Sequence, residues 1–239
     1  MAVSTLAPPS ASVTAHASRH STFVRITHWI TALCFLALLI TGVEILLSHP
    51  RFYWGESGNV LDAPLFKLPL PASRASVPTG YRYVLADQNG WSRSLHFEAA
   101  WASVFTGLLY VAYGLLTGHF RRNLLPSRDE VFLPDLRSVT VRLPSYNLLQ
   151  RLTYLSVIFL LFPAVIWTGL AMSPAIASAS PSLVTVLGGQ QSARTLHFFV
   201  SVLLVLFVIV HIAMVTRAGF QNRMREMIAG PPATGKDQA

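Results

Sequence analysis

The chain has 239 residues, of which 52% are hydrophobic and only 12% are charged. Soluble domains average about 25% charged residues, so this composition excludes a typical soluble protein and a disordered one. The net charge of +8 does not indicate nucleic-acid binding, because basic residues that anchor a membrane protein on its cytoplasmic side produce the same balance. The lone cysteine, Cys34, excludes an internal disulfide framework, a covalent C-x-x-C-H haem and a cysteine-ligated iron–sulfur cluster. These properties indicate an integral membrane protein.

The chain opens with a leader rich in Ser, Ala and Pro, residues 1–20, which we expect to be disordered, cytoplasmic and free of a removable signal peptide. Four later stretches each supply the roughly 20 apolar residues that a helix needs to cross a bilayer. They are residues 23–47, 95–116, 152–172 and 195–216. Lipid cannot satisfy an exposed backbone, so these stretches should be helices. The sequence predicts an all-α membrane domain, residues 21–217, built as a four-transmembrane-helix bundle.

The segments that connect the spans differ in character. Residues 48–92 form a long segment rich in proline and aromatic residues, and residues 118–150 are basic. Pro163 is expected to kink the third span. A weaker apolar stretch, residues 175–189, is too short to span and is predicted to be interfacial or re-entrant. Residues 218–239 are predicted to be a polar cytoplasmic tail.

Basic residues predict the orientation of the bundle. If the N-terminus is cytoplasmic, six of the 18 basic residues lie outside and the other twelve lie inside. The six are Arg51, Lys67, Arg74, Arg82, Arg93 and Arg194. Cytoplasmic loops carry the excess of Lys and Arg, so we expect both termini in the cytoplasm.

Four of the eight histidines lie inside a predicted span or at its mouth: His28, His96, His197 and His211. An ionisable group there is costly and therefore a functional candidate, although a single histidine can also simply hydrogen-bond between helices. The 14 residues from His197 to His211 correspond to about 21 Å of helix and return to within roughly 40° of one face. With the predicted orientation, His28 lies at the depth of His211, and His96 at the depth of His197.

Two imidazoles at equal depth on different helices suit six-coordinate haem iron, which a four-helix bundle can hold between facing helices. Zinc would need three or four ligands in one place. The sequence therefore predicts two non-covalent b-type haems. His28 and His211 would hold the inner iron, and His96 and His197 the outer iron. The other four histidines are predicted not to bind iron.

An Arg-x-x-His pattern accompanies three of these histidines. Arg25, Arg93 and Arg194 each lie three residues before a candidate ligand, hence on the same helix face and nearer the water. Guanidinium groups there suit the haem propionates, while anchoring at the membrane surface is an equally ordinary role for arginine. Arg217 is a weaker candidate beyond His211.

Glycines and glutamates in the spans leave two readings open. Gly42, Gly107, Gly114 and Gly169 can allow close approach of a porphyrin or ordinary packing of helices. Glu44 and Glu98 can handle protons, or can simply be solvated near the outer interface.

The Arg-x-x-His-Trp run at 25–29, His96 at the start of its span, and the 14-residue interval that ends at His211 resemble a known group. It is the bacterial cytochrome b561 and nickel–iron hydrogenase cytochrome b group of di-haem membrane proteins. The likeness extends over roughly residues 23–216. It implies the histidine pairing above, a place in the bacterial inner membrane, and electron transfer between a partner protein and membrane quinone. Four predicted spans depart from the five-span hydrogenase pattern, which argues against a hydrogenase subunit.

The outer segment resembles part of a more specific relative. Residues 49–58, His-Pro-Arg-Phe-Tyr-Trp-Gly-Glu-Ser-Gly, are similar to a stretch in thiosulfate-reductase-like cytochromes that accompany molybdopterin oxidoreductases. This resemblance implies a periplasmic redox partner of that kind, although such aromatic residues equally suit the membrane surface. We expect an electron-transfer subunit rather than a self-contained enzyme, with lipid and quinone as its other partners.

Two alternative functions stay open. Some compact members of the same family are thought to oxidise superoxide at the outer face and to reduce quinone without a partner protein. An outer segment of about 45 residues favours a docked partner instead. A haem-free transporter or proton channel lined by histidines is the second alternative, and it leaves the depth-matched histidine pairs unexplained.

Overall fold

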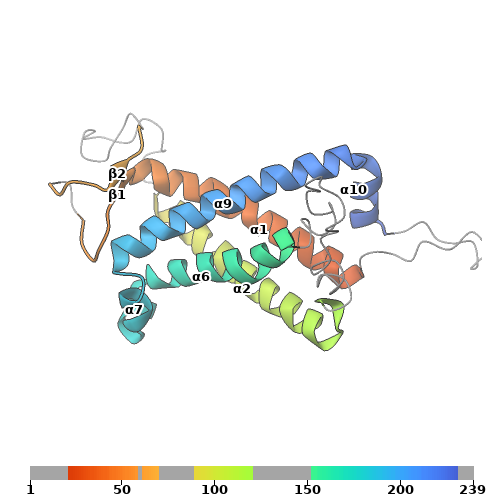
Figure 1. Ribbon diagram of the computed structural model, residues 1–239, viewed down its shortest axis with the longest axis horizontal. Coiled ribbons are helices and arrows are strands. Elements are labelled where there is room, and N and C mark those ends of the chain that lie inside the picture. The colour runs from red at the N-terminus through yellow and green to blue at the C-terminus, as the bar shows by residue number, and fades with distance from the viewer. Residues whose placement is uncertain (1–20, 59–60, 70–88, 121–151, 231–239) are drawn as a thin grey trace, which may run out of the picture.

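The computed structural model describes residues 21–58, 61–69, 89–120 and 152–230 (Figure 1). Four helices in these ranges are long and apolar enough to cross a membrane. They are α1 (Thr22–Ser48), α2 (Asn89–Leu116), the third span (Leu152–Ala171) and α9 (Gln190–Arg217). The predicted all-α, four-helix membrane bundle is therefore confirmed. The leader and nearly all of the basic connection lie outside the described residues.

Two of the helices begin earlier than hydropathy predicts. α2 begins at Asn89, six residues before the predicted start at Leu95, and α9 begins at Gln190, five residues before Thr195. The first turns of both helices carry polar side chains, which a search for apolar stretches passes over. Each helix therefore extends beyond its predicted apolar span and carries polar turns at that end.

The third span contains a π-helical turn, η1 (Val157–Leu161), which leads into α6 (Phe162–Ala171). Pro163 lies two residues after the end of this turn, with Phe162 between them. Proline has no N–H group and its ring clashes with the carbonyl four residues earlier in a regular α-helix. The wider turn relieves this conflict, with the Phe162 N–H group bonded to the carbonyl of Val157. Pro163 was expected to kink this span, and the irregularity found beside it is this π-helical turn.

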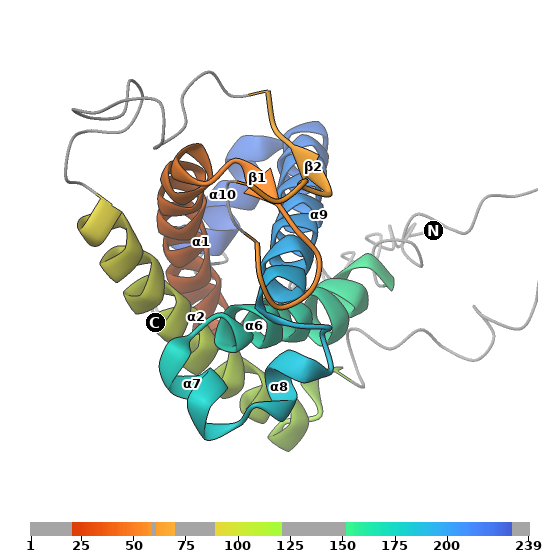
Figure 2. The ribbon, with the colours of Figure 1, turned by 90° about the vertical axis from the view of Figure 1, so that its left-hand side faces the viewer.

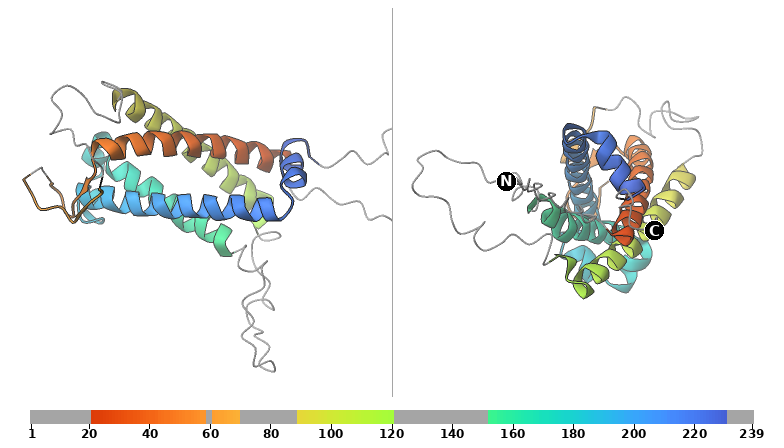
Figure 3. Two further views of the ribbon diagram at one scale, coloured as in Figure 1. Left: turned by 90° about the horizontal axis from the view of Figure 1, so that it is seen from above. Right: turned by 90° about the vertical axis from the view of Figure 1, so that its right-hand side faces the viewer.

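The four long helices form two closely packed pairs. α1 packs against α2, and α6 packs against α9, whereas within the described part of the chain the two pairs make few close backbone contacts with each other. α1 and α9 both run along the long axis of the molecule (Figure 3). The space between the pairs is where the histidines of different helices meet.

The two ends of the bundle carry different structures. At one end, here called the hairpin end, β1 (Arg51–Phe52) pairs antiparallel with β2 (Phe66–Lys67). At the other, the α10 end, α9 is followed by the short helix α10 (Phe220–Ile228) (Figure 1), whose last two carbonyls accept hydrogen bonds from Arg25 and Trp29 of α1. The sequence predicted a polar cytoplasmic tail over residues 218–239, and the structure adds that Phe220–Ile228 within it form a helix. Its apolar residues Phe220, Met224 and Met227 recur at helical spacing.

Residues 49–58 and 61–67, which contain both strands and are here called the hairpin segment, are joined to the start of α9 by hydrogen bonds. The carbonyl of Gly55 accepts from the N–H groups of Gln191 at 3.0 Å and Ser192 at 3.2 Å. The hydroxyl of Thr195 donates to the carbonyl of Tyr53 at 2.7 Å. The first N–H groups of a helix have no partner within it, so the hairpin segment supplies an acceptor for two of them.

The stretch predicted to be interfacial or re-entrant folds into two short helices at the hairpin end (Figure 2). These are α7 (Pro174–Ala179) and α8 (Ser182–Thr185). A small apolar core beside them joins Ala171, Val184 and Ala193. Elsewhere large apolar side chains on the spans face outward, as on a surface that lipid covers, and Leu33 is 66% exposed.

Candidate cofactor site

Two histidines from different helices face each other at the α10 end. His28 comes from α1 and His211 from α9, and their ring centroids are 6.3 Å apart with an interplanar angle of 50°. Phe207, one turn before His211, stacks on it with the centroids 5.8 Å apart. Trp29 lies edge-on to His28 at 5.4 Å. Aromatic rings therefore flank this pair.

A second pair lies at the hairpin end. His96 comes from α2 and His197 from α9, and their ring centroids are 6.4 Å apart with an interplanar angle of 61°. The Nδ1 atom of His96 is 2.9 Å from the hydroxyl of Thr41 on α1. The Nδ1 atom of His197 is 3.0 Å from the hydroxyl of Thr168 on α6. All four helices of the bundle thus contribute to this pair.

The spacing within both pairs fits a haem iron between two imidazoles. Two metal–nitrogen bonds of about 2 Å, with each ring centre about 1 Å beyond its nitrogen, put the ring centres roughly 6 Å apart. The observed separations are 6.3 and 6.4 Å. No cluster of three or more His, Cys, Asp or Glu side chains suited to a metal occurs among the described residues. The histidines meet in twos, as axial haem ligands do.

The three arginines of the Arg-x-x-His pattern have different surroundings. Arg25 donates to the carbonyl of Ile228, the last residue of α10, at 3.4 Å, and to the hydroxyl of Thr22 at 3.1 Å. Its Nε atom is buried and has no hydrogen-bond partner among the described residues. Arg194 donates to the carbonyl of His49 and lies over an aromatic ring of the hairpin. Arg93 is exposed on the first turns of α2.

The glycines and glutamates singled out in the sequence also differ in their surroundings. A Cβ atom on Gly42 or Gly169 would lie 3.7 or 3.4 Å from the Cε1 atom of His96 or His197, so these two glycines adjoin the hairpin-end pair. Gly114 adjoins the ring of Phe120, and Gly107 faces open space. Glu44 has a buried carboxylate oxygen with no hydrogen-bond partner in the described ranges. Glu98 is exposed and accepts from Ser94 at 3.3 Å.

Sequence reasoning missed Thr41 and Thr168, the side chains that hold the hairpin-end histidines. A signal for them was present, because the dipeptide Thr-Gly occurs in both spans, at residues 41–42 and 168–169. It was weak on its own, since Thr-Gly also occurs at residues 79–80, 106–107, 117–118 and 234–235. The hydroxyl of Thr106, for example, donates to the carbonyl of Ala102.

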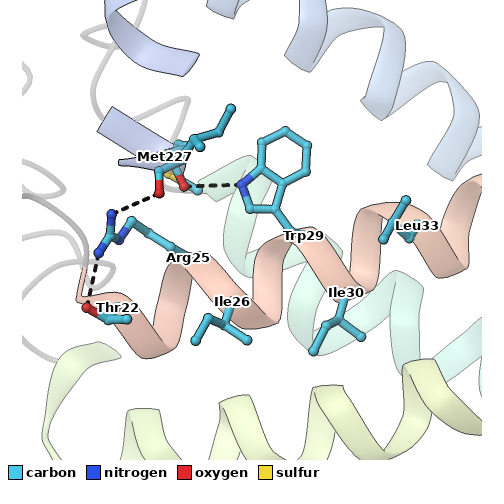
Figure 4. A pocket seen from close by; sticks show the side chains of 8 residues that line it. Thr22, Arg25, Ile26, Trp29, Ile30, Leu33 and Met227 are labelled. Atoms are coloured by element: carbon cyan, nitrogen blue, oxygen red, sulfur yellow. Dashed lines mark hydrogen bonds between the residues drawn. The ribbon is translucent and has the colours of Figure 1, made fainter. Parts of the chain in front are cut away.

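A pocket of about 280 Å³ lies between α1 and α10 (Figure 4). Its lining is mainly apolar, with Leu33 and Met227 among its walls. Arg25 and Trp29 point from α1 toward the end of α10, where the indole N–H group donates to the carbonyl of Met227 at 3.1 Å. The pocket therefore adjoins the helix turn that carries His28.

Comparison with known proteins gives two matches. Residues 19–230 match the family described as prokaryotic cytochrome b561. Over 202 residues the chain is 27% identical to the putative protein-methionine-sulfoxide reductase subunit YedZ1 of Azospira oryzae. The aligned part covers 82% of this chain and 89% of that protein. No solved structure matches the chain significantly. The matched region includes all four membrane helices and both histidine pairs.

Proposed function

The chain belongs to the prokaryotic cytochrome b561 family of membrane electron-transfer subunits, and from this premise we propose that it carries electrons from membrane quinol to a periplasmic reductase through two b-type haems. The observation that carries the proposal is the pair of histidine sites. Each has two imidazoles from different helices at a spacing that admits one iron, 6.3 and 6.4 Å between ring centroids.

The two sites lie at different depths of the membrane. His197 and His211 are 14 residues apart on the uninterrupted helix α9, which corresponds to about 21 Å along its axis. The hydrocarbon core of a bilayer is about 30 Å thick, so the sites lie toward opposite surfaces. When bound, the haems supply one-electron transfer between these surfaces. The chain supplies the ligands, their orientation and an apolar surrounding.

Arginine side chains are proposed to bind the haem propionates. Arg25 supports this role best, because its buried Nε–H group has no acceptor in the described residues and a carboxylate would provide one. Arg93 is exposed and free to reach a propionate at the hairpin end. Arg194 already donates to the carbonyl of His49, and a guanidinium has further donors that a carboxylate can accept.

The direction of electron flow follows from the partner that the relative's name suggests. YedZ1 is named as a subunit of a protein-methionine-sulfoxide reductase, and we propose a partner of the same kind, of the molybdopterin class expected from residues 49–58. Reduction of a sulfoxide to a thioether takes up two electrons and two protons and releases water. The electrons must therefore leave the membrane toward the partner, and quinol is oxidised to quinone with release of two protons.

The hairpin end is proposed as the partner's docking surface and as the periplasmic face. The excess of basic residues on the other side of the membrane supports this orientation. Hydrogen bonds to α9 hold the hairpin segment in place, yet Trp54 remains 58% exposed and Leu65 59% exposed. Exposed aromatic and apolar side chains on a fixed backbone are typical of a protein interface.

The pocket at the α10 end is proposed to receive the quinone ring. It adjoins the turn of His28, its lining is mainly apolar, and its volume of about 280 Å³ is close to the lower limit for small-molecule sites. Arg25 and Trp29 line it and supply its polar edge.

The haem content of the purified protein tests this proposal. A pyridine haemochrome spectrum, normalised to protein, should give two b-type haems per chain for the wild type and about one for His197→Ala. His49→Ala is the matched control and should keep two, because alanine keeps the backbone carbonyl to which Arg194 donates. A well-folded wild type without haem would refute the proposal and favour the histidine-lined transporter.

A second assay tests the partner. Quinol-reduced protein should be reoxidised by a methionine sulfoxide reductase supplied with a sulfoxide-containing peptide. Efficient quinone reduction by superoxide alone, with no effect of the reductase, would support the stand-alone alternative.

A further inference from the structure

The two histidines of the hairpin-end pair are held in the same way by threonines on neighbouring helices. The hydroxyl oxygen of Thr41 is 2.9 Å from Nδ1 of His96, and the hydroxyl oxygen of Thr168 is 3.0 Å from Nδ1 of His197. Both threonines are almost completely buried, at 0% and 3% exposure. Water therefore does not compete for these two contacts.

The backbone determines which partner donates in each contact. Thr41 lies 2.7 Å from the carbonyl oxygen of Ala37, and Thr168 lies 2.8 Å from that of Ala164. A carbonyl can only accept, and a hydroxyl has one hydrogen, which a threonine in a helix commonly donates to a carbonyl three or four residues earlier. In that arrangement the threonine oxygen accepts from the imidazole. Nδ1 then carries the proton, and Nε2 keeps the lone pair that binds a metal.

A glycine follows each threonine and adjoins the same edge of the imidazole. A Cβ atom at Gly42 would lie 3.7 Å from Cε1 of His96, and one at Gly169 would lie 3.4 Å from Cε1 of His197. The hydroxyl thus binds Nδ1 while the glycine next to it lies against the adjacent carbon. The same arrangement occurs on α1 and on α6, once for each histidine of the pair.

We propose that Thr41 and Thr168 are positioning residues that fix the tautomer and the ring orientation of His96 and His197 for ligation through Nε2. This inference rests on the proposed function, because it concerns the haem at the hairpin end. A hydrogen bond from the non-ligating nitrogen raises the basicity of a metal-bound histidine, and loss of such a bond typically costs 10- to 100-fold in metal affinity.

The expected effect is selective for one haem. A more basic imidazole stabilises ferric iron more than ferrous iron, so removing the hydroxyl should raise the midpoint potential of the hairpin-end haem. A tenfold loss of ferric preference corresponds to about 59 mV for a one-electron couple. The other pair lies about 21 Å away along α9, so the potential of its haem should not change.

Valine is the test substitution because it keeps the β-branched shape and removes only the hydroxyl. In redox titrations of the full-length holoprotein, Thr41→Val and Thr168→Val should each raise the midpoint potential of one of the two haems. The expected rise is about 59 mV for each tenfold loss of ferric preference. Thr41→Ser and Thr168→Ser should restore the wild-type potentials. Electron paramagnetic resonance should show a change in the same haem only.

The matched control is Thr106→Val. Thr106 on α2 is also buried, also precedes a glycine and also donates to the carbonyl four residues earlier, at 2.7 Å. Unlike Thr41 and Thr168, it has no hydrogen bond to a histidine ring among the described contacts. It should leave both potentials unchanged. Equal potentials in wild type and both test valine variants would overturn the proposal, as would an equal shift in Thr106→Val.

Loss of haem is also informative. A valine variant that loses one haem while its serine counterpart keeps two supports the proposal, whereas loss from the serine variant as well overturns it. If the wild type binds no haem, the proposed function fails, but the tautomer can still be measured. Nitrogen-15 NMR of histidine-labelled protein should find Nδ1 protonated in His96 and His197, and the opposite tautomer in both would refute the inference.

Discussion

Gly189 joins the short helix α8 to α9 and lies against the backbone of the hairpin segment. Its φ is +113°, in the region that side chains rarely adopt. A Cβ atom there would lie 2.5 Å from the carbonyl carbon and oxygen of Gly55 and 2.6 Å from the nitrogen of Glu56. These are all backbone atoms, so no side chain can rotate away. Gly189→Ala should therefore push the hairpin segment off the start of α9.

The size of the effect follows from the bonds that would be lost. Three hydrogen bonds join Gly55 to the first turn of α9: the N–H groups of Gln191 and Ser192 donate to the carbonyl of Gly55, and the N–H group of Gly55 donates to the hydroxyl of Ser192 at 2.7 Å. At roughly 0.5–1.5 kcal/mol each, they contribute about 3 kcal/mol to closing the contact. Because about 1.4 kcal/mol is a factor of ten, opening should become roughly 100-fold more frequent. The unfavourable φ adds about 1–3 kcal/mol.

Hydrogen exchange of the amides of Gln191 and Ser192, followed by mass spectrometry in detergent, measures this opening. Gly219→Ala is the matched control, because Gly219 also has a positive φ, +94°, but nothing lies within 4 Å of its added Cβ atom. It separates backbone strain from the clash. The reasoning would be refuted if the two amides exchanged no faster in Gly189→Ala than in the wild type.

Two further predictions concern single hydrogen bonds at opposite ends of the bundle. Thr195 is 1% exposed, and Thr195→Val leaves the carbonyl of Tyr53 without this bond, so it should cost about 1–3 kcal/mol and lower Tm by roughly 2–4 °C per kcal/mol. Thr195→Ser should recover most of the loss, and an unchanged Tm in the valine variant would contradict the argument. Trp29→Phe removes the indole donor to Met227 and should speed amide exchange in α10 by about 2- to 10-fold. Trp167→Phe removes an equivalent indole bond near α8 and should leave α10 unchanged; equal acceleration in both variants would argue against a local anchor.

The membrane helices were predictable because hydropathy is a local property. Four apolar stretches predicted four helices, and all four are present. The pairing of the histidines was predicted from the rise of about 1.5 Å per residue and from the alternating order of crossings. In the structure His28 lies beside His211 and His96 beside His197, while their role as haem ligands stays a prediction.

The surroundings of the arginines were not predictable from the same pattern. The spacing of Arg25 and His28 puts them on one helix face, but it does not reveal which distant segment reaches that face. In the structure a residue 203 positions later accepts from Arg25, and one 145 positions earlier accepts from Arg194. A long, flexible guanidinium bonds whichever carbonyl the packing brings within reach.

The sequence by itself determined the number of spans and predicted which histidines meet in two pairs, because both depend only on local hydropathy and on the regular rise of a helix. Only the tertiary structure decided that Thr41 and Thr168 meet the hairpin-end histidines and that α10 folds back onto α1. These contacts depend on how each helix is rotated about its own axis and which neighbour it packs against. The rotation is set by the packing of all the helices together, so neither a dipeptide nor a span alone contains it.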